Sequence, residues 1–298
     1  GLGDVYKRQL EDIKIPCLHI GGWYDLYPQG TLNLFKGMQE RGGSKFAREN
    51  QHVIIGPWVH NASETTTAGD IDFGVDSVLD LKEIELSWFD KWLKDIPDSF
   101  EQSSPVKIFM MGSNEWRNEE SWPPKNITNT PIYLHSNGNS NSASGDGLLS
   151  FEKPGKETAD SFTYNPMFPV PTKGGGNCCD PHIVNWGAFD QREVEARADI
   201  LVYTSKTLTS EMEISGPIIL KLFASTDCRD TDFTAKLVDV FPDGKAINLC
   251  DGIIRGRYRD STKQQSLLNP GEVYEFTIDL YLSLIHISEP TRLGMISY

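Results

Sequence analysis

Two apolar runs near the start of the chain each lead into an ionisable residue. The first run, residues 13–20, passes through a pair of glycines to Asp25, and the second, residues 53–59, ends at His60. Continuous apolar runs are typical of the buried strands of a parallel sheet. In open α/β sheets, ligands and chemistry collect beyond the carboxyl ends of the strands. The pattern therefore predicts that Asp25 and His60 face a common crevice.

Helical spacing follows each of these runs. Residues 27–40 carry apolar side chains one turn apart and end at two glycines, which favour a helix C-terminus. Residues 78–93 carry the strongest helical pattern of the chain, and Pro97 closes it. An apolar stripe marks this second helix: Leu81, Ile84, Trp88 and Trp92. The order strand, helix, strand, helix predicts a parallel α/β unit over residues 10–98.

The pattern changes after the polar, turn-rich residues 94–104, which we interpret as a domain boundary. Short strand-like runs with turn signals between them follow at 106–111, 131–135, 200–203, 217–225, 233–241 and 273–281. Many short strands at such spacing favour a two-sheet β-sandwich, here a jelly roll, over residues 105–282. The predicted fold class is therefore α/β plus all-β: the C-terminal part of an α/β domain followed by an incomplete jelly-roll-like sandwich.

Both ends of the chain differ from the sequence between them. Residues 1–9 have no apolar core of the kind that a signal peptide needs, and residues 283–298 follow a strand without a turn that would close a domain. We interpret both segments as non-native tails outside the fold. The natural chain is then expected to be cut at both ends.

Composition excludes several classes of function. The net charge of −14 argues against a nucleic-acid partner, and no apolar run reaches the roughly eighteen residues that span a bilayer. The five cysteines lack the paired spacing of a metal or redox site, so free or buried thiols are expected. His135, His182 and the acids near them lack metal-ligand spacing, and the glycines at 174–176 lack the spacing of a phosphate-binding loop. We therefore predict no cofactor and no metal.

Asp25 and His60 suit two members of a Ser-His-Asp site. Asp25 would accept a hydrogen bond from the histidine Nδ1 and fix its tautomer, and His60 would act as the general base. Each has a simpler alternative, since Asp25 suits a helix cap or turn and His60 suits a polar surface loop. In α/β-hydrolases the triad follows the chain order Ser, Asp, His. Asp25 followed by His60, with a helix between their strands, fits that order.

The nucleophile of such a site is absent from the sequence. It is expected upstream in a Gly-x-Ser-x-Gly turn, and the chain contains no such motif. Ser44 lacks the second glycine and falls between acid and base, and Ser140 lies in a Ser/Asn/Gly-rich stretch expected to be a surface loop. The chain alone is therefore predicted to be inactive.

Short motifs along the chain occur in the order found in one family of acyl hydrolases. They lie at residues 22–25 (GWYD), 56–60 (GPWVH), 88–94 (WFDKWLK), 106–112, 116–117, 121–124 (SWPP), 199–205 (DILVYTS), 216–217, 230–239 and 255–259. Over about residues 10–282 the chain resembles the C-terminal half of the family that includes cocaine esterase, α-amino acid ester hydrolases and X-prolyl dipeptidyl peptidases.

The resemblance implies an α/β-hydrolase domain followed by a β-sandwich that packs against it. It implies Asp25 as the triad acid and His60 as the triad base. The serine, a tyrosine oxyanion donor and a helical cap would lie upstream, without counterparts here. The family's final sandwich strands are also expected to be missing after Ser283.

Three aromatic residues flank the predicted site: Trp23, Tyr27 and Trp58. They could shape an acyl pocket for a small-molecule ester or amide, or they could fill the core at the sheet edge. An alternative function is a carbohydrate- or protein-binding module formed by residues 105–282. An exposed row of aromatic side chains would favour it, whereas Trp116, Trp122 and Trp186 fall in predicted loops.

Overall fold

The two apolar runs form neighbouring parallel strands, β1 (Cys17–Tyr24) and β2 (Gln51–Val59), in the computed structural model of the chain. The structure describes residues 9–60, 63–97, 100, 104–178, 180, 182–288 and 290–298. Helix α2 (Pro28–Arg41) confirms the helix predicted between the strands. Its buried face includes Phe35, which is fully covered. A short helix that the pattern did not predict, α3 (Lys45–Glu49), leads into β2.

Two further strands extend this sheet beyond the predicted boundary. The sequence places residues 106–111 in the second domain, but β5 (Val106–Met110) pairs in parallel with β2, and β6 (Glu115–Glu119) pairs antiparallel with β5. The sheet order is β1-β2-β5-β6. The physical reason is that every residue of β5 except Lys107 is apolar and buried, which suits a strand of a covered parallel sheet.

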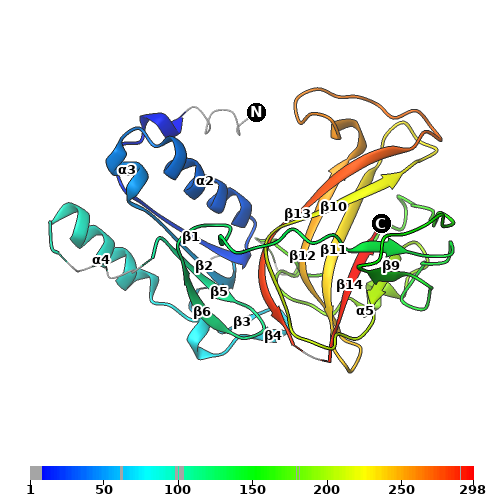
Figure 1. The fold of residues 1–298 in the computed structure, drawn as a ribbon, viewed down its shortest axis with the longest axis horizontal. Coiled ribbons are helices and arrows are strands. Elements are labelled where there is room, and N and C mark those ends of the chain that lie inside the picture. Colours follow the sequence, from blue (N-terminus) through cyan, green and yellow to red (C-terminus); the bar gives the residue numbers. More distant parts are fainter. Residues whose placement is uncertain are drawn as a thin grey trace.

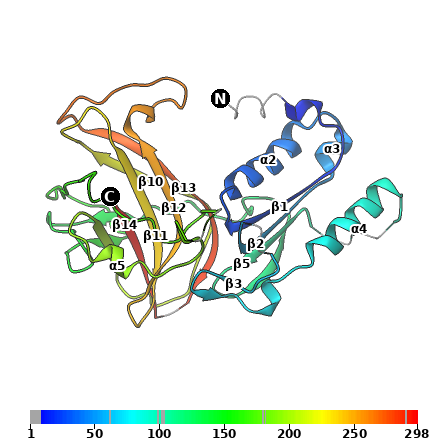
Figure 2. The same ribbon diagram turned by 180° about the vertical axis from the view of Figure 1, so that it is seen from behind.

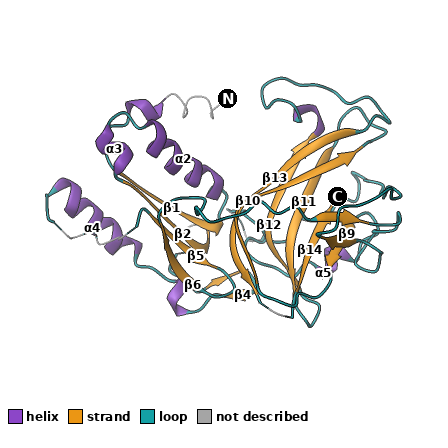
Figure 3. Cartoon of the chain, in the orientation of Figure 1, coloured by secondary structure: helices purple, strands orange, loops and turns teal. Residues whose placement is uncertain are grey.

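The second predicted helix is α4 (Leu81–Leu93), which begins three residues later than its apolar pattern. Asp80 accepts a hydrogen bond from the backbone N–H of Glu83 at 3.1 Å and so caps the first turn. We call the described residues of 9–119 the α/β lobe. Helices α2, α3 and α4 lie in this lobe, whereas the regular elements of the described chain beyond it are mainly strands joined by long loops (Figure 3).

The strand-rich lobe comprises the described residues of 133–298 and contains two sheets. The larger sheet has the order β12-β11-β14-β9-β8-β7, and β10 pairs with β13. The strands of the whole lobe are β7 (Tyr133–His135), β8 (Leu148–Ser150), β9 (Leu201–Ser205), β10 (Met212–Ala224), β11 (Asp232–Val240), β12 (Ala246–Arg255), β13 (Tyr274–Ile287) and β14 (Arg292–Ser297). The remaining short elements are η1 (Leu10–Asp12), β3 (Thr67–Ala68), β4 (Ile71–Asp72), η2 (Val75–Ser77), α5 (Arg192–Glu195) and η3 (Gly256–Tyr258). The predicted α/β part and the predicted all-β part are thus both present (Figure 1).

The expectation that residues 283–298 lie outside the fold is wrong. Strand β13 continues to Ile287, and β14 lies between β11 and β9 in the larger sheet. Ile287 and Ile296 are fully buried. Leu293, Met295 and Ile296 of β14 are buried in the hydrophobic clusters that contain the other strands of this sheet. Residues 1–8 of the other predicted tail lie outside the described residues.

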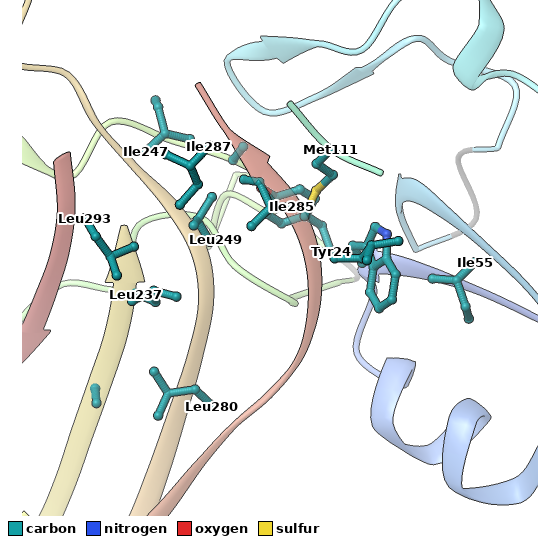
Figure 4. Close-up of a cluster of buried hydrophobic side chains, with 14 of the residues drawn as sticks. Tyr24, Ile55, Met111, Leu237, Ile247, Leu249, Leu280, Ile285, Ile287 and Leu293 are labelled. Carbon is teal, nitrogen blue, oxygen red and sulfur yellow. The ribbon is translucent and has the colours of Figure 1, made fainter. Parts of the chain in front are cut away.

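The two lobes share one hydrophobic core. Strand β13 lies beside the α/β sheet in both views of the molecule (Figures 1 and 2), and the backbone N–H of His286 donates to the carbonyl of Met111 at 2.8 Å. Tyr24 and Ile55 of the α/β lobe belong to the same buried cluster as Ile285 of β13 (Figure 4). The end of the α/β sheet that carries Asp25 therefore faces the strand-rich lobe.

The cysteines depart in part from the expected free thiols. Cys17, Cys228 and Cys250 are free, whereas Cys178 is disulfide-bonded. Burial raises the pKa of the Cys17 thiol, which keeps this cysteine in its protonated form.

Candidate active site

The register of β1 and β2 brings Asp25 and His60 together. Tyr24 pairs with Val59, so the next residue of each parallel strand leaves the sheet at the same edge. Glycine is required just before this point, because a Cβ on Gly22 would collide with the main-chain carbonyl of Trp58. The glycine in the first motif thus has a geometric role in placing Asp25.

Asp25 and His60 form a direct hydrogen bond. His60 Nδ1 lies 3.1 Å from Asp25 Oδ1, within the reach expected for an acid that orients a base. The same carboxylate oxygen accepts the backbone N–H of Tyr27 at 3.2 Å. The side chains are 15% exposed for Asp25 and 32% for His60, so the pair is partly shielded from water.

Asp25 is not the N-cap of helix α2, but it does bind the turn that precedes the helix. The N-cap of α2 is Tyr27, and Asp25 lies two residues before it. Asp25 therefore has a turn role, through the Tyr27 N–H, and a histidine-binding role at the same oxygen. The two interpretations are not exclusive in this fold.

The three flanking aromatic residues separate into two groups. Tyr27 is 61% exposed, and its ring lies edge-on to the His60 ring at a centroid distance of 6.0 Å. Trp23 and Trp58 are buried, and their indole N–H groups donate to the carbonyls of Phe109 and Ser77, each at 2.8 Å. Tyr27 therefore borders the Asp25–His60 pair, whereas the two tryptophans are part of the core.

The strand-rich lobe contributes neighbours that sequence reasoning missed. A Cβ on Gly176 would lie 2.5 Å from the main-chain oxygen of Asp25, so this glycine packs directly against the acid. The Tyr24 hydroxyl donates to the carbonyl of Asn248 at 3.1 Å, and burial raises the Tyr24 pKa. These partners are 151 to 224 residues apart in sequence, and no local motif marks them.

Two ionisable side chains, Asp251 and Lys236, lie near the glycines at 174–176. Asp251 Oδ2 is the atom nearest to the position that a Gly175 Cβ would occupy, and burial raises the pKa of this carboxyl. Lys236 is 2% exposed and donates to Gln191 Oε1 at 3.3 Å. Burial lowers the pKa of Lys236, while the carboxylate of Asp251 opposes that effect.

The two rejected serines have structural roles. Ser44 Oγ accepts the backbone N–H of Ala47 at 2.9 Å and so caps α3. Ser140 is fully buried, and its carbonyl accepts the N–H of Val202 at 2.9 Å, so it is part of the strand-rich lobe rather than of an exposed loop.

The described residues contain no cluster for a metal ion and no membrane-spanning helix, but they do form a groove. Within them, no group of three or more His, Cys, Asp or Glu side chains could hold a metal ion. None of their helices combines the length and apolar character needed to cross a membrane. A groove between β1 and α4 has lining residues that include neither Asp25 nor His60: Pro16, Cys17, Leu18, Ile20, Glu85, Trp88 and Phe89.

Comparison with protein families gives two matches. The model described as "X-Pro dipeptidyl-peptidase C-terminal non-catalytic domain" matches residues 98–289. The model described as "X-Pro dipeptidyl-peptidase (S15 family)" matches residues 3–62, which include Asp25 and His60.

The chain is also similar to individual hydrolases, in sequence and in structure. Cocaine esterase from Rhodococcus sp. (strain MB1 Bresler) is 37% identical over 276 residues, which are 92% of this chain and 46% of the esterase. The crystal structure of an aminopeptidase from the marine sediment archaeon Thaumarchaeota archaeon is 25% identical with a TM-score of 0.81, covering 98% of this chain and 49% of that one. An α-amino acid ester hydrolase structure, 24% identical with a TM-score of 0.83 over the same shares, has the same fold. The chain spans about half the length of the relatives that it matches.

Proposed function

Because the chain belongs to the X-Pro dipeptidyl-peptidase family, we propose that it supplies the acid and the base of a Ser-His-Asp hydrolase site. Asp25 orients His60, and His60 is the general base. One observation carries the proposal: the 3.1 Å contact between His60 Nδ1 and Asp25 Oδ1 at the ends of adjacent parallel strands. The strand-rich lobe would be the jelly-roll partner of this hydrolase domain.

The geometry supports a defined sequence of proton transfers. With Nδ1 bound to Asp25, the His60 Nε2 takes the proton of a serine hydroxyl as the serine oxygen bonds to the acyl carbon. The proton then passes to the departing alcohol or amine, and a covalent acyl-enzyme remains. Water attacks this ester, His60 again takes and returns the proton, and the free acid leaves. Asp25 stabilises the imidazolium in both halves of the reaction.

The substrate would be a small-molecule ester or amide. The relatives include ester hydrolases and an aminopeptidase, and ester and amide cleavage share the acyl-transfer chemistry of this site. The exposed ring of Tyr27 beside His60 is the described aromatic side chain best placed to touch such a substrate. In this proposal no cofactor takes part.

The alternative of a binding module has less support. Trp122 is buried, and Trp116 and Trp186 pack against the main hydrophobic core. These three tryptophans therefore do not form the exposed row that carbohydrate binding by stacking would use. The match to a non-catalytic domain covers most of the strand-rich lobe, so we assign the chemistry to the α/β lobe.

The test uses a chromogenic short-chain ester. The chain alone is expected to give no turnover, because its sequence contains no Gly-x-Ser-x-Gly turn to supply the nucleophile. A fusion that adds the remaining part of the Rhodococcus cocaine esterase is expected to restore turnover, and His60→Ala in that fusion should lower kcat roughly 1,000-fold or more. His135→Ala is the matched control, since His135 binds Glu157 in the strand-rich lobe. Turnover by the chain alone that survives His60→Ala would overturn the assignment.

A further inference from the structure

We propose that the strand-rich lobe holds the Asp25–His60 pair in register through a positioning clamp formed by residues 174–176 and 187–190. The clamp contacts the Asp25 turn and residues 68–70, which follow His60 by eight to ten residues, and it comes from a part of the chain more than 100 residues away. This inference rests on the proposed function, because it concerns the geometry of the same acid and base. Its members are positioning residues and touch no reacting atom.

The first arm of the clamp is Gly176, which lies against the acid. A Cβ at this position would be 2.5 Å from the main-chain oxygen of Asp25 and 3.3 Å from its carbonyl carbon. Both are backbone atoms, so no flexible side chain can rotate away to make room. Any larger residue at 176 must therefore displace the Asp25 turn or the glycine turn.

The second arm lies against the segment that follows His60. The N–H of Ala188 donates to the carbonyl of Ala68 at 3.1 Å, and the N–H of Asp70 donates to the carbonyl of Ala188 at 2.7 Å. Gly187 allows this approach, because a Cβ there would lie 2.6 Å from the backbone nitrogen of Gly69. Residues 187–190 thus bind the backbone of residues 68–70, in the segment that follows His60.

The two arms form one unit. Gly175 and Gly187 exchange backbone hydrogen bonds of 2.8 and 3.0 Å, and Gly175 has a φ of +89°, a conformation that favours glycine. Asn248 of β12 is 1% exposed and anchors the second arm, because its Oδ1 accepts the N–H of Phe189 at 2.7 Å. The glycines at 174–176 therefore have a packing role in place of the phosphate-binding role excluded by their spacing.

A side-chain contact ties the Asp25 turn to the same lobe independently. Gln29 Nε2, in the first turn of α2, donates to Asp279 Oδ2 of β13 at 2.5 Å. Gln29 lies four residues after Asp25, so this bond and Gly176 restrain opposite ends of one short turn. Loss of either contact gives Asp25 freedom to move relative to His60.

The test is NMR of the whole chain with ¹⁵N-labelled histidine, which reads the Asp25–His60 bond without any substrate. A histidine Nδ1–H that donates to a carboxylate gives a downfield proton and a ¹⁵N shift typical of the Nδ1–H tautomer. Asp25→Asn should abolish this signature of His60 and serves as the reference for a broken pair. The signals of the other five histidines are internal controls.

Gly176→Ala should shift the His60 signature toward that of Asp25→Asn, and Gly155→Ala should leave it unchanged. Gly155 is the matched control because a Cβ there would meet nothing within 4 Å. Gln29→Met, which keeps the side-chain length but removes the bond to Asp279, should shift the signature in the same direction by less. This variant decides the question if Gly176→Ala does not fold, as judged by circular dichroism.

Two further outcomes distinguish failure of the clamp from failure of the Asp25–His60 pair. If Asp25→Asn abolishes the signature while folded Gly176→Ala and Gln29→Met keep it, the clamp is overturned and the acid–base pair stands. If the signature is absent from the unsubstituted chain, or survives Asp25→Asn, the pair itself is refuted. The proposed function and the clamp then fall together.

Discussion

Trp23 in β1 and Tyr27 at the start of α2 lie only four residues apart but in opposite environments. The Trp23 ring is 5% exposed and lies 5.6 Å from the Trp122 ring, whereas Tyr27 is 61% exposed. Trp23→Ala should lower the free energy of unfolding by about 3–5 kcal/mol, since it leaves a cavity and removes the indole N–H that donates to the Phe109 carbonyl. Tyr27→Ala should change it by about 0.5 kcal/mol or less. Urea unfolding followed by circular dichroism measures both, and equal losses would contradict this distinction.

The sequence could not separate these two aromatic residues, and the reason is physical. Whether a ring at the end of a strand is covered depends on what packs over it, and the partner of Trp23 is Phe109, 86 residues away. Asp25 and His60 were predictable because their relation depends on strand order and chain order alone. Gly176 was not, because its role depends on contact with a distant backbone.

Glu195 provides a pH test at the scale of one residue. Burial raises its pKa to about 7, with a further contribution from Asp190, and Arg192 and Arg292 oppose the shift. The folded state thus binds a proton more tightly than the unfolded state, so stability falls as pH rises from about 4.5 to about 7. Glu195→Gln should remove this loss and raise stability at pH 8 by roughly 1–3 kcal/mol, with little effect near pH 4.5.

Thermal melts of the unsubstituted chain and Glu195→Gln across this pH range test the prediction. Glu193→Gln is the matched control, because the Glu193 side chain is in the same short helix but is 83% exposed. A pH dependence that is identical in all three proteins would show that Glu195 is not the titrating group.

At the scale of elements, helices were predicted more closely than strand partners. The spacing within 27–40 and 78–93 is local information, and α2 and α4 appear where it indicates, apart from the later start that Asp80 imposes. Strand β5 was recognised as a strand but assigned to the wrong sheet. A strand's pattern records how much of it is buried, but its hydrogen-bond partner is set by the whole fold.

Strand β14 is the element on which the sequence interpretation and the structure differ most. Ile296 is fully buried in a cluster with Val194, Ile200 and Val238. Ile296→Ala should therefore cost about 2–5 kcal/mol of unfolding free energy. Ile183→Ala is the matched control, since Ile183 is 83% exposed and should change stability by about 0.5 kcal/mol or less. A negligible effect of Ile296→Ala in urea unfolding would restore the interpretation of 283–298 as a tail outside the fold.

At the scale of the whole molecule, the two lobes are joined where the site is. Met111 follows β5 and exchanges backbone hydrogen bonds with β13: its N–H donates to the carbonyl of Leu284 at 3.2 Å, and its carbonyl accepts from His286. Its side chain is 1% exposed and lies in the core that both lobes share (Figure 4). The lobes therefore cannot separate without exposing apolar surface beside the Asp25 loop.

The shared core predicts that the molecule unfolds in a single transition. Six of the seven tryptophans lie before residue 123, so fluorescence reports mainly on the α/β lobe, whereas far-ultraviolet circular dichroism also reports on the strand-rich lobe. The two signals should give the same urea midpoint.

Met111→Ala should lower that midpoint in both, by an amount equivalent to about 2–5 kcal/mol, because the cavity forms in the core common to both lobes. Met167→Ala, at a position 79% exposed, should leave both midpoints unchanged. Separate midpoints in the unsubstituted chain would mean that the lobes fold independently, and the strand-rich lobe could not then hold Asp25 in place.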